Sequence, residues 1–213
     1  MLVTERMRRK VVTVEAEDSL QNASGLMKKG SIRHLPVVQG ERLIGIITDR
    51  DLRQAMVPID GTTKGKEAYR LPKEGKVLEY MTREMITVTP NTDIEEAACM
   101  IYCHKIGGLP VIGEEGELVG IITETDLLTV FIEMMGILMA SSRVDVILRE
   151  SPQAFEDACR IIKAYDGQII SVGMSGHENR QKRVYYFRLE LCDIQPIIIA
   201  LKESGYQVVS ALE

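Results

Sequence analysis

The feature that most constrains this 213-residue chain is an internal repeat at a nearly fixed spacing. Residues 7–38 align with residues 81–112 without a gap, and after a one-residue insertion residues 43–52 align with residues 118–127. The last two segments, LIGIITDRDL and LVGIITETDL, are identical at seven of ten positions. A unit of this size buries little surface alone, so we infer that residues 1–140 contain one structural unit twice.

Each copy predicts the element order β-α-β-β-α. A strand at residues 11–14 or 85–88 comes first, and a capping residue, Asp18 or Thr92, then begins a helix. Two strands joined by a glycine-containing turn follow, and the second runs directly into another helix. Two such copies can pack their sheets together around a pseudo-twofold axis. The first helices each carry one apolar stripe, made of Leu20, Ala23, Leu26 and Met27 or of Ile94, Ala97, Ala98 and Ile101.

The rest of the chain predicts a linker and a second kind of domain. Residues 57–76 hold three glycines, two prolines and five lysine or arginine residues, a composition typical of a surface linker. From Arg143 the pattern is β-α-β-β-α-β, the split-βαβ order of ferredoxin-like folds, with Ser151 and Asp193 as helix caps. We therefore expect an α+β chain with two repeats at 1–56 and 77–140, a linker at 57–76 and a ferredoxin-like domain at 141–213.

Charge and hydropathy exclude some classes of partner. The formal net charge of −5 gives no electrostatic footprint for nucleic acid, so no nucleic-acid partner is expected. The longest apolar run, residues 127–140, contains Glu133 and is too short to span a bilayer. We interpret this run as a buried or dimer-facing helix and expect no membrane insertion. The first ten residues are basic but no long apolar stretch follows them, so a signal peptide is not predicted.

The four cysteines predict free thiols. They show no CxxC spacing, and although Cys99 and Cys103 share a helix face beside His104, no second ligand pair lies near them in sequence. We therefore predict no metal site and interpret these thiols as small buried hydrophobes. Free thiols fit a reducing compartment, so a cytoplasmic protein is expected.

The motif T-x-x-D closes an apolar strand in both copies. Locally, the simplest interpretation is a capping box at a strand-to-helix junction. Two observations favour a ligand site as well: the motif occurs twice in register, and a glycine, Gly45 or Gly120, precedes each strand end. A helix N-terminus suits phosphate, a nearby carboxylate can accept ribose hydroxyls, and one motif can do both. The residues are Thr48 with Asp51 and Thr123 with Asp126.

With the motifs LPVV…LIGIITDRDL and LPVI…LVGIITETDL, residues 1–140 resemble a tandem pair of cystathionine-β-synthase (CBS) domains, a Bateman module. The resemblance implies two clefts between the repeats. Each cleft would join the Thr and Asp of one repeat to the first strand and the residues before LPV of the other. The implied ligands are adenosine derivatives, namely AMP, ADP, ATP or S-adenosylmethionine, acting as effectors and not as catalytic cofactors.

The resemblance also implies which residues line each cleft. In the first cleft, Asp126 would hold ribose, Val12 and Ile32 would line the adenine slot, and Arg33 and His34 would meet phosphate. A solvated loop is the alternative interpretation of Arg33 and His34. We expect the first cleft to be the one equipped for a charged nucleotide. The first cleft would consist of Thr123, Asp126, Val12, Ile32, Arg33 and His34, and the second of Thr48, Asp51, Ile86, Ile106, Gly107 and Gly108.

The C-terminal 70 residues resemble an ACT domain, and the whole layout resembles the acetoin-utilization AcuB-type proteins. Amino-acid-binding ACT domains usually carry a glycine after the first strand. Gln153 occupies that position here, so pairing of this domain with another copy is the alternative to amino-acid binding. The resemblance further implies a homodimer.

Three functions follow from these observations. The first is a regulator in which a bound adenine nucleotide controls an unidentified partner or the protein's own assembly. The second is a dimerisation scaffold with vestigial clefts, and the third is an amino-acid sensor acting through the ACT-like domain. The sequence has no paired acid and base, no glycine-rich phosphate loop and no triad candidate, so we expect no catalytic residues and no enzyme.

Overall fold

The computed structural model describes residues 1–58 and 69–212, so much of the predicted linker lies outside the described residues. The chain divides into two compact units, Met1–Leu127 and Leu128–Glu213. This division differs from the expected boundary after residue 140. The residues after Met134 pack within the second unit, because the Ser171 hydroxyl donates to the Met135 carbonyl oxygen at 2.9 Å.

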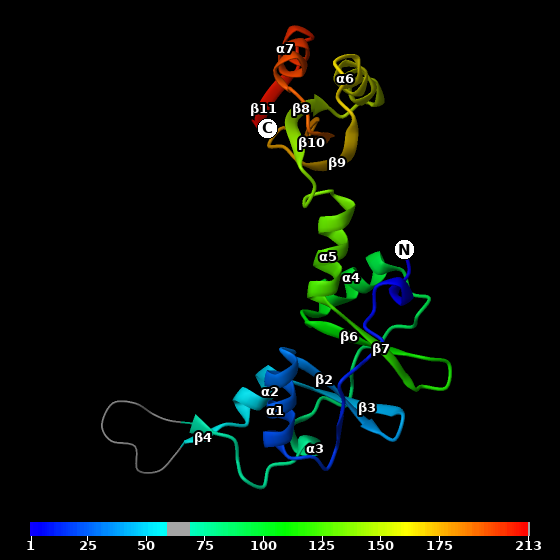
Figure 1. Cartoon of the computed structure of the whole chain (residues 1–213), viewed down its shortest axis with the longest axis vertical. Helices are drawn as coiled ribbons and strands as arrows, with labels where there is room; N and C mark the ends of the chain where they lie inside the picture. The colour runs from blue at the N-terminus through cyan, green and yellow to red at the C-terminus, as the bar shows by residue number, and fades with distance from the viewer. Residues whose placement is uncertain (59–68, 213) are drawn as a thin grey trace, which may run out of the picture. The chain divides into compact units, whose positions relative to one another are not determined.

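The first copy forms a small sheet covered by its own helices. The parallel pair β1–β2 continues into the antiparallel hairpin β2–β3, and α1 and α2 lie beside that hairpin (Figure 1). The predicted apolar stripe is confirmed, since Leu20, Ala23 and Met27 are buried and Leu26 is half-buried. The elements are β1 (Val14–Glu15), α1 (Leu20–Gly30), β2 (His34–Gln39), β3 (Arg42–Thr48) and α2 (Asp49–Gln54).

The second copy repeats this arrangement with one difference. Its hairpin β6–β7 is antiparallel and α4 packs against β6. The strand expected at residues 85–88 is reduced to one parallel bridge between Val88 and Val111, and its counterpart β1 has only two residues, not the four expected at 11–14. The elements are α3 (Val77–Tyr80), α4 (Ile94–His104), β6 (Gly108–Ile112), β7 (Leu118–Thr123) and α5 (Glu124–Met134).

The two copies exchange their first turns. The 3₁₀ turn η1 (Val3–Glu5) begins the first copy but lies on the second, where the Val3 amide donates to the Thr92 carbonyl at 2.9 Å. Conversely, the Val77 amide at the start of α3 donates to the Asp18 carbonyl at 2.9 Å. These equivalent contacts follow the predicted pseudo-twofold relation and hold the copies together.

The predicted capping residues of the first helices are wrong by one position. Ser19, and not Asp18, caps α1 and accepts the Asn22 amide at 3.1 Å. Asp93, and not Thr92, precedes α4. The reason is the local backbone, because Ser19 and Asp93 are the residues with extended angles directly before the two helices. The Asp18 carboxylate instead accepts the amide of Glu15 in β1.

The second unit has the predicted β-α-β-β-α-β order. Its antiparallel sheet has the strand order β11-β8-β10-β9, and both helices share one core with it and therefore cover the same face. Ser151 caps α6 as predicted and accepts the Ala154 amide at 3.3 Å, and Asp193 accepts the Gln195 amide at 2.9 Å where α7 begins. The elements are β8 (Ser141–Arg149), α6 (Pro152–Ala164), β9 (Ile169–Gly176), β10 (Lys182–Glu190), α7 (Gln195–Glu203) and β11 (Gln207–Leu212).

The two ends of the predicted linker are attached to the first copy. β4 (Val57–Pro58) pairs with β5 (Tyr69–Arg70). Further along, the Leu20 amide donates to the Gly75 carbonyl at 3.0 Å, so the linker ends beside the start of α1. The segment at 59–68 lies outside the described residues.

The exposure of two segments, the cysteines of α4 and the apolar run at 127–140, bears on their interpretation. Cys99 and Cys103 are exposed on α4, so their interpretation as small buried hydrophobes is wrong. In the apolar run at 127–140, Val130 is buried, but Phe131 and Leu138 are 54% and 83% exposed. None of the described helices is both long and apolar enough to cross a membrane.

Candidate functional site

The first cleft is a cavity of about 370 Å³ within the first unit, formed by residues of both copies. Its size falls in the range of small-molecule sites, which begins at about 300 Å³. Arg8 and Lys10 were not anticipated from the sequence, and they add two cations to its wall. Five of the six predicted residues line this cavity: Val12, Ile32, Arg33, His34 and Thr123. The sixth, Asp126, does not line it but pairs with Arg8, which does.

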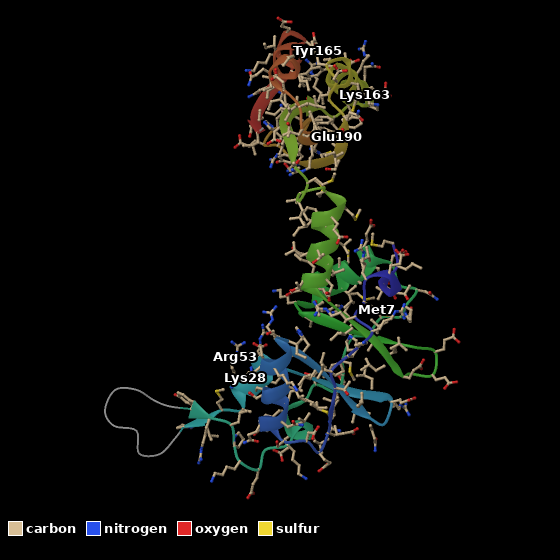
Figure 2. The ribbon with its side chains drawn as sticks, viewed as in Figure 1. Met7, Lys28, Arg53, Lys163, Tyr165 and Glu190 are labelled. Atoms are coloured by element: carbon tan, nitrogen blue, oxygen red, sulfur yellow. The ribbon has the colours of Figure 1, made fainter. Side chains whose placement is uncertain are left out.

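The second cleft is a cavity of about 480 Å³ on the other side of His34, and it is also lined from both copies. The residues aligned with Arg33 and His34 are Gly107 and Gly108 here, but the cavity has basic side chains from elsewhere. Arg50 and Arg53 of α2 and Lys105 after α4 line it, and Figure 2 shows Arg53 among the side chains of its helix. All six predicted residues line the cavity, namely Thr48, Asp51, Ile86, Ile106, Gly107 and Gly108.

The T-x-x-D motif forms the predicted capping box in both clefts. Asp51 Oδ2 accepts the Thr48 amide and hydroxyl, both at 2.7 Å. Asp126 Oδ2 accepts the Thr123 amide at 3.0 Å and the hydroxyl at 2.6 Å. Each carboxylate therefore uses one oxygen to begin a helix and keeps Oδ1 for other contacts.

The two Oδ1 atoms have different surroundings. Arg8 Nε donates to Asp126 Oδ1 at 3.0 Å, although Arg8 and Asp126 are 118 residues apart. The Arg8 side chain is 56% exposed and that of Asp126 is 12% exposed. Within residues 1–58 and 69–212, no hydrogen bond or ion pair reaches Oδ1 of Asp51, and the residue aligned with Arg8 is Thr82. The two clefts therefore differ at the carboxylate itself.

The glycines before the strand ends have a packing role. A Cβ on Gly120 would lie 2.6 Å from the sulfur of Met7, and one on Gly45 would lie 2.8 Å from that of Met81. Figure 2 labels Met7, which lies on the segment that crosses to β7. These glycines make room for the exchanged segments, so they do not support the phosphate interpretation that we drew from them.

His34 stands between the two clefts. It lines both cavities together with Arg33 and Gly107. Burial, reinforced by the positive charge of Arg33, lowers the pKa of His34, and the carboxylates of Asp49 and Glu124 oppose this shift. The ring therefore favours its neutral form, which can offer a ligand one donor and one acceptor.

Each cleft thus combines three kinds of recognition. Apolar side chains, Val12 with Ile32 or Ile86 with Ile106, can contact the faces of a flat ring. A carboxylate at the start of a helix, Asp51 in the wall of the second cleft or Asp126 behind Arg8 of the first, can accept hydroxyl groups. Arginine side chains can pair with an anion. This combination suits a ligand that contains an aromatic base, a diol and a negatively charged group.

Comparison with known proteins relates the repeated unit to a described family. Residues 3–58 and 77–133 match the CBS domain family. The chain is 31% identical over 207 residues to an inosine-5′-monophosphate dehydrogenase of Methanocaldococcus jannaschii. The aligned region covers 94% of this chain and 39% of the dehydrogenase. It thus spans about two fifths of the length of that enzyme.

Two crystal structures each resemble somewhat more than three fifths of the chain. One is the CBS domain pair of protein MJ0100 in complex with 5′-methylthioadenosine and S-adenosyl-L-methionine, with a TM-score of 0.51 and 27% identity over 62% of this chain and 99% of that one. The other is a Vibrio cholerae protein described as the acetoin utilization protein AcuB. It has a TM-score of 0.53 and 32% identity over 64% of this chain and 94% of that one.

Proposed function

This chain belongs to the CBS-domain family, and we propose that it is a regulatory protein whose clefts bind an adenosine derivative, AMP, ADP, ATP or S-adenosylmethionine. The observation that carries the proposal is the repeated capping box, whose Asp51 lines the second cleft and whose Thr123 lines the first, each beside an apolar slot supplied by the other copy. The adenosyl ligands in the related domain pair support this choice.

Binding regulates only if the ligand has different affinities for two states of the protein. Both clefts are built from residues of both copies, so a ligand that tightens a cleft also changes how the copies pack. We propose that this change controls either a partner protein or the assembly of the chain with itself. The similarity to AcuB supports a role in acetoin utilization.

A thermal shift measurement on the full chain tests the proposal. A ligand present at about 100 times its dissociation constant stabilises the protein by about 2.7 kcal/mol, which raises the melting temperature by several degrees. We expect at least one of AMP, ADP, ATP and S-adenosylmethionine to produce this shift. Unchanged melting curves with all four would contradict adenosyl sensing and favour a scaffold with vestigial clefts.

Substitution of the two carboxylates assigns the clefts. Asp126→Asn and Asp51→Asn change the charge of one cleft each with little change in shape, and each should reduce the thermal shift. Asp157→Asn is the matched control, because Asp157 pairs with Arg160 on α6 in the other unit. A thermal shift that survives both cleft substitutions would show that the ligand binds elsewhere.

For the second unit we propose an ACT-like domain that pairs with another copy in a cytoplasmic homodimer. The βαββαβ order and the exposed apolar side chains at Leu128, Phe131 and Leu138 support this proposal. Amino-acid sensing has less support, because Gln153 occupies the expected glycine position and its side-chain amide donates to Asp157 at 3.3 Å.

A further inference from the structure

The clefts differ most clearly at two residues that occupy equivalent backbone positions. Arg8 forms an antiparallel bridge with Ile121, with N–O distances of 2.9 and 3.1 Å. Thr82 forms the same bridge with Ile46, at 2.8 and 2.9 Å. Since the backbone contacts match, the difference between these positions lies in the side chains alone.

The Arg8 side chain lies on the carboxylate expected to hold ribose. Its Nε contacts Asp126 Oδ1 at 3.0 Å, while Oδ2 is already used by Thr123. A ribose diol that approaches Asp126 must therefore compete with the guanidinium for Oδ1. In the second cleft, Thr82 places no cation on Asp51, so the same diol meets an oxygen that has no partner among the described residues.

We propose that Arg8 is a specificity-determining residue that makes the first cleft select ribosides carrying an anionic group. This inference rests on the proposed function. An uncharged riboside that takes Asp126 Oδ1 leaves the Arg8 guanidinium without its partner. A phosphorylated riboside supplies a new anion for it, and charge-assisted pairs of arginine with phosphate are strong. Uncharged ribosides therefore prefer the second cleft, where Asp51 is not masked.

The expected effect is moderate. Arg8 is 56% exposed, and ion pairs of this kind are worth about 0.2–1 kcal/mol, which corresponds to a factor of about 1.4 to 5 in affinity. Removal of Arg8 should therefore strengthen the binding of adenosine to the first cleft by a factor of about 1.4 to 5. The binding of AMP should not be strengthened, because the same change removes a cation available to its phosphate.

The test is an exchange of the two side chains, measured by calorimetric titration of the full chain with adenosine and with AMP. In an Asp51→Asn background, which isolates the first cleft, Arg8→Thr should raise adenosine affinity and lower the ratio of AMP to adenosine affinity. In an Asp126→Asn background, Thr82→Arg should weaken adenosine binding to the second cleft. Arg9→Thr is the matched control, because Arg9 bonds to Thr4 at 2.8 Å and does not line the first cleft.

Two different failures can be told apart. If adenosine and AMP bind through Asp126 but Arg8→Thr leaves adenosine affinity unchanged or lowers it, the role of Arg8 is wrong and the proposed function stands. If neither compound binds the parent chain or any variant, the role of Arg8 is wrong, and the thermal shift measurement with ADP, ATP and S-adenosylmethionine decides whether the proposed function stands. Arg8→Gln serves as a second variant, and circular dichroism melts should show that both variants fold as the parent does.

Discussion

The imidazole of His34 lies against the backbone of Gly107, so that a Cβ at position 107 would stand 2.6 Å from Nε2. One residue comes from each copy, and both line both clefts. This contact is the wall shared by the two clefts. A ligand that displaces His34 on one side therefore changes the shape of the cleft on the other.

The first prediction concerns this wall. Gly107→Ala should destabilise the protein by at most about 1 kcal/mol, because the added methyl group forces the His34 ring to move but the cavities on both sides leave it room. Gly25→Ala should have the opposite sign and stabilise by about 0.5–1 kcal/mol, since Gly25 lies inside α1 with open space around it. Urea unfolding of both variants measures the two changes in the free energy of unfolding. Equal changes would contradict the contact between His34 and Gly107.

The second prediction concerns pH. Burial and Arg33 lower the pKa of His34 below its usual value of about 6.5, against the opposing carboxylates of Asp49, Glu124 and Asp51. The unfolded chain therefore binds a proton first, and the stability from neutral His34 is present above about pH 6.5 and lost as the pH falls below it. Urea unfolding between pH 7.5 and 5.5 should show a flatter pH dependence for His34→Gln than for the parent. If the free energy of unfolding depends on pH equally in His34→Gln and in the parent, His34 does not contribute to this pH dependence.

The third prediction separates the structural role of the T-x-x-D motif from ligand binding. Thr48→Ala and Thr123→Ala remove the hydroxyl that caps α2 or α5, and each should cost about 1 kcal/mol without any ligand present. Thr→Ser at the same positions keeps the hydroxyl and should recover most of this loss. Denaturant unfolding of the ligand-free chain is the measurement, and stability unchanged in the alanine variants would argue against the caps.

The fourth prediction concerns the second unit. Arg143 donates two hydrogen bonds of 2.7 Å to the buried carboxylate of Asp145 and lies over the Tyr186 ring, 5.0 Å from its centre. Asp145→Ala leaves the guanidinium without its acceptor and should cost about 1–3 kcal/mol. Asp157→Ala, which removes an exposed pair with Arg160, should cost at most about 1 kcal/mol. Denaturant unfolding of both variants is the measurement. A larger loss of stability in Asp157→Ala than in Asp145→Ala would contradict the prediction.

Much of the fold follows from the sequence because it depends on periodicity. The duplicated motif and the apolar stripe that includes Leu20 and Met27 predict the repeated unit, and alternation of helix and strand signals predicts the order of the second unit. The predicted first strands are too long. The segment at 11–14 crosses between the copies, and only Val14 of it enters a strand pair. The caps predicted at Asp18 and Thr92 are each one residue too early. Backbone angles determine which residue caps a helix, and composition alone does not give them.

The site was predictable where a motif carries it. Asp51 lines the second cleft as the repeated motif suggests, whereas Asp126 does not line the first cavity itself and contacts Arg8, which does. Arg8 was missed because its pair with Asp126 joins distant parts of the chain, and nothing local to Arg8 marks it. The cations of the second cleft, Arg50 and Lys105, lie outside the aligned phosphate positions, so sequence comparison of the two copies did not find them.

The most direct test of the central claim is a calorimetric titration of the full chain with AMP, repeated with Asp51→Asn, Asp126→Asn and the double variant. If both clefts bind through these carboxylates, each single substitution should weaken one set of sites about tenfold or more. The double variant should then bind AMP about tenfold more weakly at both clefts, as expected when a hydrogen bond to a charged group is lost, while melting at nearly the same temperature as the parent. AMP binding that persists unchanged in the folded double variant would contradict the account.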